Sequence, residues 1–250
     1  MQVVVNNLLT NYQIHGTGSK TLLFLHGWAD TSQTFDSLIK NLNCKTITLD
    51  LPGFGGTQTP PQAWHLQDYA QFVADFLAKI DVEPTVIIGH SNGGSIAIYG
   101  TAHAILKPTQ LVLIASAGIR ERSAKKTALR LLAKPAKTAL RFAPPHTQKR
   151  VKNKLYSAIG SDYLVAEHMQ DTFRNIVGQD VQVDAGKIKI PVCLVYGEDD
   201  IATPLSYGKV FNALMRNSTL NSIPLSGHFV HQEQAVKVAT YIKDFVGTAK

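Results

Sequence analysis

The chain has 250 residues, of which 44% are hydrophobic and 17% are charged, and its formal net charge is +7. This length suits one large domain, or one domain with an insertion, and the composition indicates a globular protein rather than a disordered one. Because no run of about 18 apolar residues occurs, the sequence excludes a transmembrane helix.

The start of the chain and its cysteines bear on the cellular compartment. Residues 1–16, MQVVVNNLLTNYQIHG, have no basic start, no long apolar stretch and no small-residue cleavage site. We therefore expect no secretory signal and a cytoplasmic location. Cys44 and Cys193 lie in or beside predicted strands, and two cysteines imply no disulfide scaffold. We expect both to be buried free thiols.

Short apolar runs and helical spacings alternate along the first half of the chain. Runs closed by glycine or proline predict strands, and apolar residues at helical spacing predict helices. The predicted elements are a hairpin of strands at 3–9 and 11–16, a strand at 21–25, a helix at 34–42, a strand at 45–49, a helix at 66–80, a strand at 86–88, a helix ending near 106 and a strand at 110–115.

The same alternation resumes from residue 188. Strands are predicted at 191–196 and 219–223, and helices at 204–215 and 232–246. Such repeated alternation predicts an α/β fold with a mostly parallel central sheet and helices on both faces. Residues 119–187 are helical in composition but interrupted by prolines. We therefore expect a core at 1–118 and 188–250, with a helical cap at 119–187 inserted between two core strands.

Residues 84–94, PTVIIGHSNGG, carry the pattern that says most about function. A β-branched run ends at Gly89, and Ser91 then stands between Gly89 and Gly93. A strand, a G-x-S-x-G turn and a helix of small residues make up a nucleophile elbow. Side chains at the two glycine positions would collide with neighbouring backbone, and the helix would point its N-terminal amides at the hydroxyl. Alone, the pentapeptide also fits a glycine-rich turn with a solvated serine.

Two further polar side chains follow later strands. Asp200 comes directly after the strand at 191–196, and His228 follows the strand at 219–223, so both are expected at one edge of the sheet. Ser, then an acid, then His is the chain order of triads in this architecture. Glu198 and Asp199 are rivals for the acid. His231 is a rival for the base, although we expect it to be solvated or to cap a helix.

The segment His26-Gly27-Trp28 follows an earlier strand and completes the set. Its loop can supply one backbone amide to an oxyanion, best assigned to Trp28, and Asn92 can supply the other. His26 is expected to be structural, with its ring hydrogen-bonded to backbone, and His90 to pack under the elbow. No cluster of His, Cys, Asp or Glu has the spacing of a metal site, and no cofactor is expected.

Together, these segments make the chain resemble the cap-bearing, esterase-like α/β-hydrolases. The resemblance implies that Ser91 is the nucleophile, Asp200 the acid and His228 the base, because the family pattern favours the third residue after Gly197. It also argues against haloalkane dehalogenases and epoxide hydrolases, which place Asp at the elbow. The matching segments are HGW at 26–28, DLPGFGGT at 50–57, GHSNGG at 89–94, YGEDD at 196–200 and SGH at 226–228.

The predicted cap carries most of the positive charge. Residues 119–155 contain twelve Lys or Arg and one acid, Glu121, which leaves about −4 for the rest of the chain. Four of these basic residues, Arg130, Lys134, Lys137 and Arg141, form one helical stripe. A solvated cap face is the interpretation we favour. The alternatives are peripheral contact with anionic lipid and attraction of acidic substrates or of nucleic acid, which we do not expect as a partner.

The expected reaction is hydrolysis of a small-molecule carboxylic ester through an acyl-enzyme on Ser91. Phe54, Phe142 and Tyr163 are guesses for the pocket lining, and the few aromatic residues of the cap favour a small or medium acyl chain. The same triad would also serve lactone or C–C bond hydrolysis, or acyl transfer. A ligand-binding or membrane-associated protein that retains the fold is the non-catalytic alternative. The sequence predicts no oligomeric state.

Overall fold

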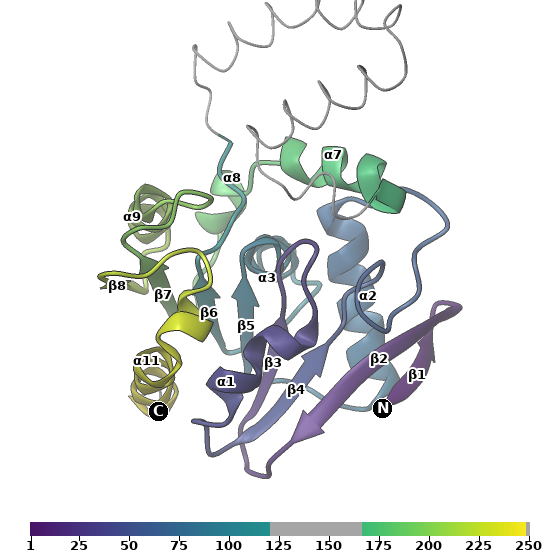
Figure 1. The fold of residues 1–250 in the computed structure, drawn as a ribbon, viewed down its shortest axis with the longest axis horizontal. Helices are drawn as coiled ribbons and strands as arrows, with labels where there is room; N and C mark the ends of the chain where they lie inside the picture. The colour runs from purple at the N-terminus through teal and green to yellow at the C-terminus, as the bar shows by residue number, and fades with distance from the viewer. Residues whose placement is uncertain (121–166, 249–250) are drawn as a thin grey trace, which may run out of the picture.

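The computed structural model describes residues 1–120 and 167–248. They form a central sheet with helices on both faces (Figure 1). Its strands are β1 (Gln2–Val5), β2 (Leu8–His15), β3 (Thr21–Leu25), β4 (Lys45–Leu49), β5 (Val86–His90), β6 (Gln110–Ile114), β7 (Val192–Gly197) and β8 (Ser218–Ile223). The helices of the described residues are η1 (Ser32–Phe35), α1 (Asp36–Ile39), α2 (Leu66–Lys79), α3 (Asn92–Ala102), η2 (Glu167–Met169), α7 (Gln170–Gly178), α8 (Gln182–Ala185), α9 (Leu205–Leu214), α10 (Val230–Glu233) and α11 (Ala235–Thr248).

The eight strands form one sheet in the order β1-β2-β4-β3-β5-β6-β7-β8. The pairs β1–β2 and β2–β4 are antiparallel, and every pair from β4 through β3 to β8 is parallel. The predicted mostly parallel α/β sheet is therefore confirmed. Because the parallel strands all end at the same edge, the loops that follow β3, β5, β6, β7 and β8 meet there.

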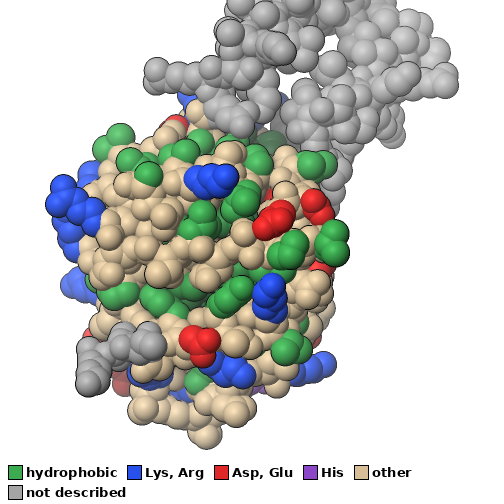
Figure 2. Space-filling model, turned by 90° about the vertical axis from the view of Figure 1, so that its left-hand side faces the viewer, with side chains coloured by type: hydrophobic (Ala, Val, Ile, Leu, Met, Phe, Trp, Pro, Cys, Tyr) green, Lys and Arg blue, Asp and Glu red, His purple; other side chains and the backbone are tan. Residues whose placement is uncertain are grey.

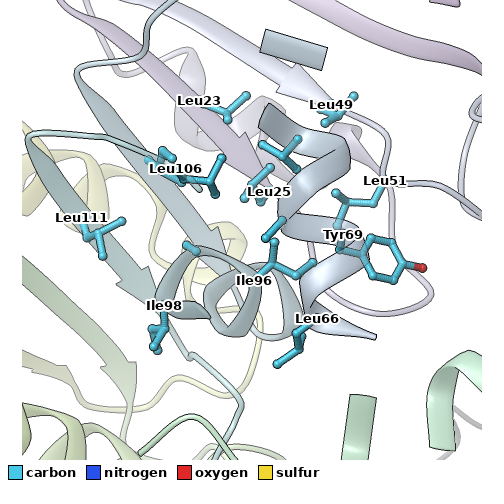
Figure 3. Close-up of a cluster of buried hydrophobic side chains, with 14 of the residues drawn as sticks. Leu23, Leu25, Leu49, Leu51, Leu66, Tyr69, Ile96, Ile98, Leu106 and Leu111 are labelled. Atoms are coloured by element: carbon cyan, nitrogen blue, oxygen red, sulfur yellow. The ribbon is translucent and has the colours of Figure 1, made fainter. Parts of the chain in front are cut away.

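Helices cover both faces of the sheet and give it two cores. On one face, α2, α3, α8 and α9 cover strand side chains such as Leu23 and Leu25 of β3. Ile96 of α3 belongs to the same core (Figure 3). On the other face, α1, α10 and α11 cover alternate residues of the same strands, among them Leu22 and Phe24. Burial on both sides explains why these strands are continuous apolar runs rather than alternating ones.

Three local features differ from the sequence prediction. The hairpin turn lies at Asn6-Asn7 rather than near residue 10, since both asparagines adopt positive φ, of 48° and 63°, as tight hairpin turns require. The predicted helix at 34–42 is only η1 and α1, because Asn41 donates its side-chain amide to the carbonyl of Ser37 and ends the helix. Cys44 is partly exposed rather than buried, whereas Cys193 is buried, and both are free thiols.

The face formed by α9, β8 and α11 carries hydrophobic side chains in several small groups among polar and charged ones (Figure 2). Some exposed apolar residues belong to loops at the carboxyl edge of the sheet, namely Ile201 and Leu225. Within residues 1–120 and 167–248, no helix has the length and hydrophobicity to span a bilayer.

Candidate active site

Ser91 sits in a strained turn between β5 and α3. Its backbone has φ of 50° and ψ of −114°, a conformation that non-glycine residues rarely adopt. Two hydrogen bonds hold the turn: the Ser91 amide donates to the carbonyl of Ile114, and the Ala117 amide donates to the carbonyl of Ser91, each at 3.0 Å. The end of β6 therefore fixes the position of the predicted nucleophile.

The two glycines of the turn are required by close packing, as the sequence predicted. A Cβ atom on Gly89 would lie 2.6 Å from the backbone carbon of Gly93. A Cβ atom on Gly93 would overlap the carbonyl group of Leu25 at the end of β3. Since the obstacles are backbone atoms, neither position can accept a side chain without moving a strand or α3.

Asp200 and His228 are hydrogen-bonded to each other at the carboxyl edge of the sheet. His228 Nδ1 lies 2.8 Å from Asp200 Oδ2. The Asp200 side chain is fully buried, whereas the His228 side chain is 21% exposed. An ionised carboxylate only accepts, so Nδ1 carries the proton in neutral His228 and Nε2 is left as a proton acceptor. This is the tautomer that a general base requires.

The structure brings Asp200 to His228 and leaves the two rival acids at the surface. Glu198 accepts a hydrogen bond from the hydroxyl of Ser222, and Asp199 is exposed. Burial alone would raise the pKa of Asp200. Hydrogen bonds and the charge of His228, together with hydrogen bonds from Thr203, outweigh it and lower that pKa. Asp200 is therefore the residue held as a carboxylate beside the imidazole.

His231 is buried, so the expectation of a solvated or capping histidine was wrong. Its Nε2 lies 3.0 Å from the hydroxyl of Thr34, and its ring centroid lies 4.3 Å from that of His90. The short α10 turns this face of the helix toward η1 and the core, which the sequence spacing did not reveal. Burial, with the charge of His228, lowers the pKa of His231 to about 3.

His90 connects the nucleophile turn to the loop of His228. It is buried, and its Nε2 donates to the carbonyl oxygen of His228 at 3.0 Å. The ring centroids of His90 and His228 lie 4.8 Å apart. The Ser91 hydroxyl itself forms no hydrogen bond within the described residues. His90, the residue before Ser91, thus supports the backbone of His228, while no residue of the described ranges bonds to the Ser91 hydroxyl.

The backbone of Gly27-Trp28 lies against the same turn. A Cβ atom on Gly27 would lie 3.2 Å from Ser91 Cβ, and the Trp28 ring packs at 4.9 Å from that of Phe54. Asn92 is the first residue of α3, where an amide has no acceptor within its own helix.

His26 donates from Nδ1 to the carbonyl of Gly27, and its Nε2 accepts from the backbone amide of Leu51. Its predicted structural role is confirmed.

Asp50 organises the neighbouring loop that follows β4. Its buried carboxylate accepts hydrogen bonds from the amides of Ser32 and Gly56 and from the side-chain amide of Asn11, at 2.7–2.9 Å. Burial would raise the pKa of Asp50, but these donors lower it. The carboxylate therefore joins three separate segments of the chain at the end of β4.

A surface hollow of about 430 Å³ opens beside this loop. Phe54, predicted to line the pocket, is one of its lining residues, together with Ala29, Asp30 and His168. Phe142 and Tyr163 lie outside the described residues, as do most of the predicted cap and its basic stripe. The described residues contain no group of three or more His, Cys, Asp or Glu arranged to hold a metal ion.

Thr203 contacts Asp200 and His228 and was missed by the sequence analysis. It follows Asp200 by three residues, and both its amide and its hydroxyl bond to that carboxylate. Aspartate side chains commonly accept from amides two and three residues later, so the spacing Asp-x-x-Thr is a local signal that could have indicated it. The contact with His228 is between distant segments and left no such signal.

Comparisons with known proteins identify the family of the chain. The model of the alpha/beta hydrolase family matches residues 22–240. The hydrolase YugF of Bacillus subtilis, described as uncharacterized, is 27% identical over 97% of this chain and 94% of its own length. The pimeloyl-[acyl-carrier protein] methyl ester esterase of Pseudoalteromonas atlantica is 26% identical over 85% of this chain and 88% of its own.

A solved structure shows the same fold at lower identity. A bacterial membrane phospholipase A superposes with a TM-score of 0.78 and 22% identity, covering 99% of this chain and 85% of that one. Because the family model spans most of the chain, the family is established. The chain is a hydrolase and belongs to the α/β-hydrolase family.

Proposed function

We propose that this protein hydrolyses a small-molecule carboxylic ester, of small or medium acyl chain, through an acyl-enzyme on Ser91. The observation that carries the proposal is the 2.8 Å hydrogen bond between His228 Nδ1 and the buried Asp200 carboxylate, at the edge where the strained Ser91 turn projects. An ester-cleaving relative that matches 85% of this chain supports an ester as the substrate.

In the proposed reaction, His228 Nε2 takes the proton of the Ser91 hydroxyl as its oxygen attacks the acyl carbon. The oxyanion accepts hydrogen bonds from the backbone amides of Trp28 and Asn92, whose segments border Ser91. His228 then protonates the leaving alcohol. Water repeats the sequence on the acyl-enzyme and releases the acid, while Asp200 stabilises the charged imidazole.

A fluorophosphonate probe tests the nucleophile without knowledge of the substrate. Intact mass and peptide mapping should place the adduct on Ser91. Ser91→Ala should abolish labelling and lower hydrolysis of p-nitrophenyl esters by at least about a thousandfold. Ser206→Ala, at the start of α9, is the matched control and should label normally. Ester hydrolysis that survives in Ser91→Ala would contradict the proposal.

A substrate panel tests the reaction class. We expect p-nitrophenyl esters of short and medium acyl chains to be cleaved faster than lactones and faster than a diketone with a hydrolysable C–C bond. All of these reactions would require Ser91, so the Ser91→Ala variant shows which activities belong to this site. Faster turnover of a lactone or diketone would replace the ester in the proposal while leaving the nucleophile assignment in place.

A further inference from the structure

Thr203 contacts both members of the Asp200–His228 pair, although the proposed reaction assigns it no task. It lies in the loop between β7 and α9 and is only 5% exposed. Its hydroxyl oxygen lies 2.8 Å from Asp200 Oδ2 and 3.1 Å from His228 Nδ1. The same oxygen lies 2.9 Å from the carbonyl oxygen of Ala115. One hydroxyl therefore contacts the three loops that follow β6, β7 and β8.

The position of the hydroxyl proton follows from these distances. A hydroxyl has one proton, and both the Asp200 carboxylate and the Ala115 carbonyl are within reach. The charged carboxylate is the stronger acceptor, and its Oδ2 is also the nearer of the two oxygens, at 2.8 Å against 2.9 Å. Thr203 therefore donates to Asp200 Oδ2. Its lone pairs are left to accept part of the hydrogen bond from His228 Nδ1.

Thr203 supplies two of the four donors that the described residues direct at the Asp200 carboxylate. Oδ1 accepts from the amides of Ala202 and Thr203, at 2.8 and 2.9 Å. Oδ2 accepts from the Thr203 hydroxyl and from His228 Nδ1, both at 2.8 Å. Because the Asp200 side chain is fully buried, no bulk water can replace a missing donor. The plane of the carboxylate, and so the direction of the imidazole, depends on this set.

We propose that Thr203 is a positioning residue that holds the Asp200 carboxylate and the His228 ring in the orientation that serves Ser91. The inference rests on the proposed function and assigns a further residue to that site. The hydrogen bond from the hydroxyl also stabilises the negative charge on Asp200 Oδ2. Without it, Asp200 would hold the protonated imidazole more strongly, and the base would become available only at higher pH.

Thr203→Val removes the hydroxyl at nearly constant volume and is the direct test. We expect kcat to fall by about tenfold, which corresponds to one hydrogen bond to a charged group, while KM changes by less than about twofold. The acid limb of the kcat/KM profile should move to higher pH. Thr203→Ser keeps the hydroxyl and should restore most of the rate. Thr10→Val, which removes a buried hydroxyl bonded to the carbonyl of Leu8, is the control and should leave kcat unchanged.

Wild-type kcat and acid limb in Thr203→Val would overturn the inference. An equal loss in Thr203→Ser would also overturn it, because the effect would then belong to packing of the methyl group. The low-field proton resonance of His228 Nδ1–H gives a readout independent of hydrolysis. It should shift in Thr203→Val, and an unchanged resonance also counts against the contact. A wild-type protein that the fluorophosphonate fails to label refutes the proposed function. Equal labelling rates for wild type and Thr203→Val refute only the positioning role.

Discussion

At the level of single residues, Ser91 keeps its unusual backbone only because two neighbours have no side chain. Its φ of 50° is stabilised by hydrogen bonds to Ile114 and Ala117, and the turn that contains it brings β5 and α3 close together. Gly89 and Gly93 permit that approach, since their missing Cβ atoms would meet backbone of the turn itself or of β3. The strain at the proposed nucleophile is thus supported by packing on both sides.

Gly93→Ala should destabilise the fold and reduce activity together. The new methyl group would overlap the Leu25 carbonyl, so β3 or α3 must move, at a cost of about 1–3 kcal/mol or more. Urea unfolding measures the loss, and the rate of fluorophosphonate labelling measures the displacement of Ser91. Gly247→Ala is the matched control, because nothing lies within 4 Å of its Cβ position in α11. Equal stability of the two variants would refute the steric explanation.

At the level of elements, the ends of β6 and β7 are joined by a buried side chain. Tyr196, near the end of β7, is fully buried and donates its hydroxyl to the carbonyl of Ser116 at 3.0 Å. Ser116 lies two residues beyond β6, next to Ala117, which bonds to Ser91. The bond therefore supports the segment that fixes the nucleophile turn.

Tyr196→Phe should lower the free energy of unfolding by about 1–3 kcal/mol. The change leaves the buried Ser116 carbonyl without this donor, and the loss of a partner costs more than a typical hydrogen bond contributes. Chemical denaturation gives the value. Tyr241→Phe in α11 is the control, since Tyr241 is a partly buried residue whose hydroxyl forms no hydrogen bond within the described residues. A loss of the same size in both variants would show that the bond to Ser116 is not the cause.

Elements with strong periodic patterns were predictable, and those decided by local side chains were not. The strands at 21–25 and 45–49 were predicted with the bounds found. The first is a mainly apolar run that is buried throughout, and the second consists of β-branched and apolar residues that are buried after Lys45. The turn at Asn6-Asn7 and the early end of α1 depend on individual asparagines, which periodicity does not register. Boundaries set by a single hydrogen bond therefore need coordinates.

The site could be predicted as a set of loops but not as a set of contacts. Ser91, Asp200 and His228 each follow a strand of the parallel sheet, so topology alone placed them at one edge. The resemblance favoured Asp200 over Glu198 by position alone, and the structure adds the physical reason, which is that the Asp200 side chain is buried against His228. The burial of His231 was unpredictable because its partner, Thr34, lies 197 residues away along the chain.

For the whole molecule, three buried histidines should make stability depend on pH. Burial lowers the pKa of His26 and, further, that of His90, and it lowers the pKa of His231 to about 3. The unfolded chain would bind protons at these positions below about pH 6.5, while the folded chain would not. Stability is therefore complete above that pH and is lost as pH falls toward the folded pKa values.

His231→Leu should make this pH dependence shallower by about one proton, or about 1.4 kcal/mol per pH unit between about pH 6 and pH 4.5. Urea unfolding at several pH values measures the slope for wild type and variant. The difference at about pH 8, where the imidazole is neutral in both states, gives the effect of packing and of the lost bond to Thr34. Parallel curves for the two proteins would show that His231 does not titrate between the two states.

The buried Asp50 carboxylate has a consequence for behaviour in salt. Its partners are amide groups of Ser32, Gly56 and Asn11, and no lysine or arginine pairs with it in the described part of the chain. Mobile ions weaken exposed ion pairs, but they do not reach donors held at hydrogen-bond distance from a buried group. We therefore expect the three segments that Asp50 joins to keep their arrangement as the salt concentration rises.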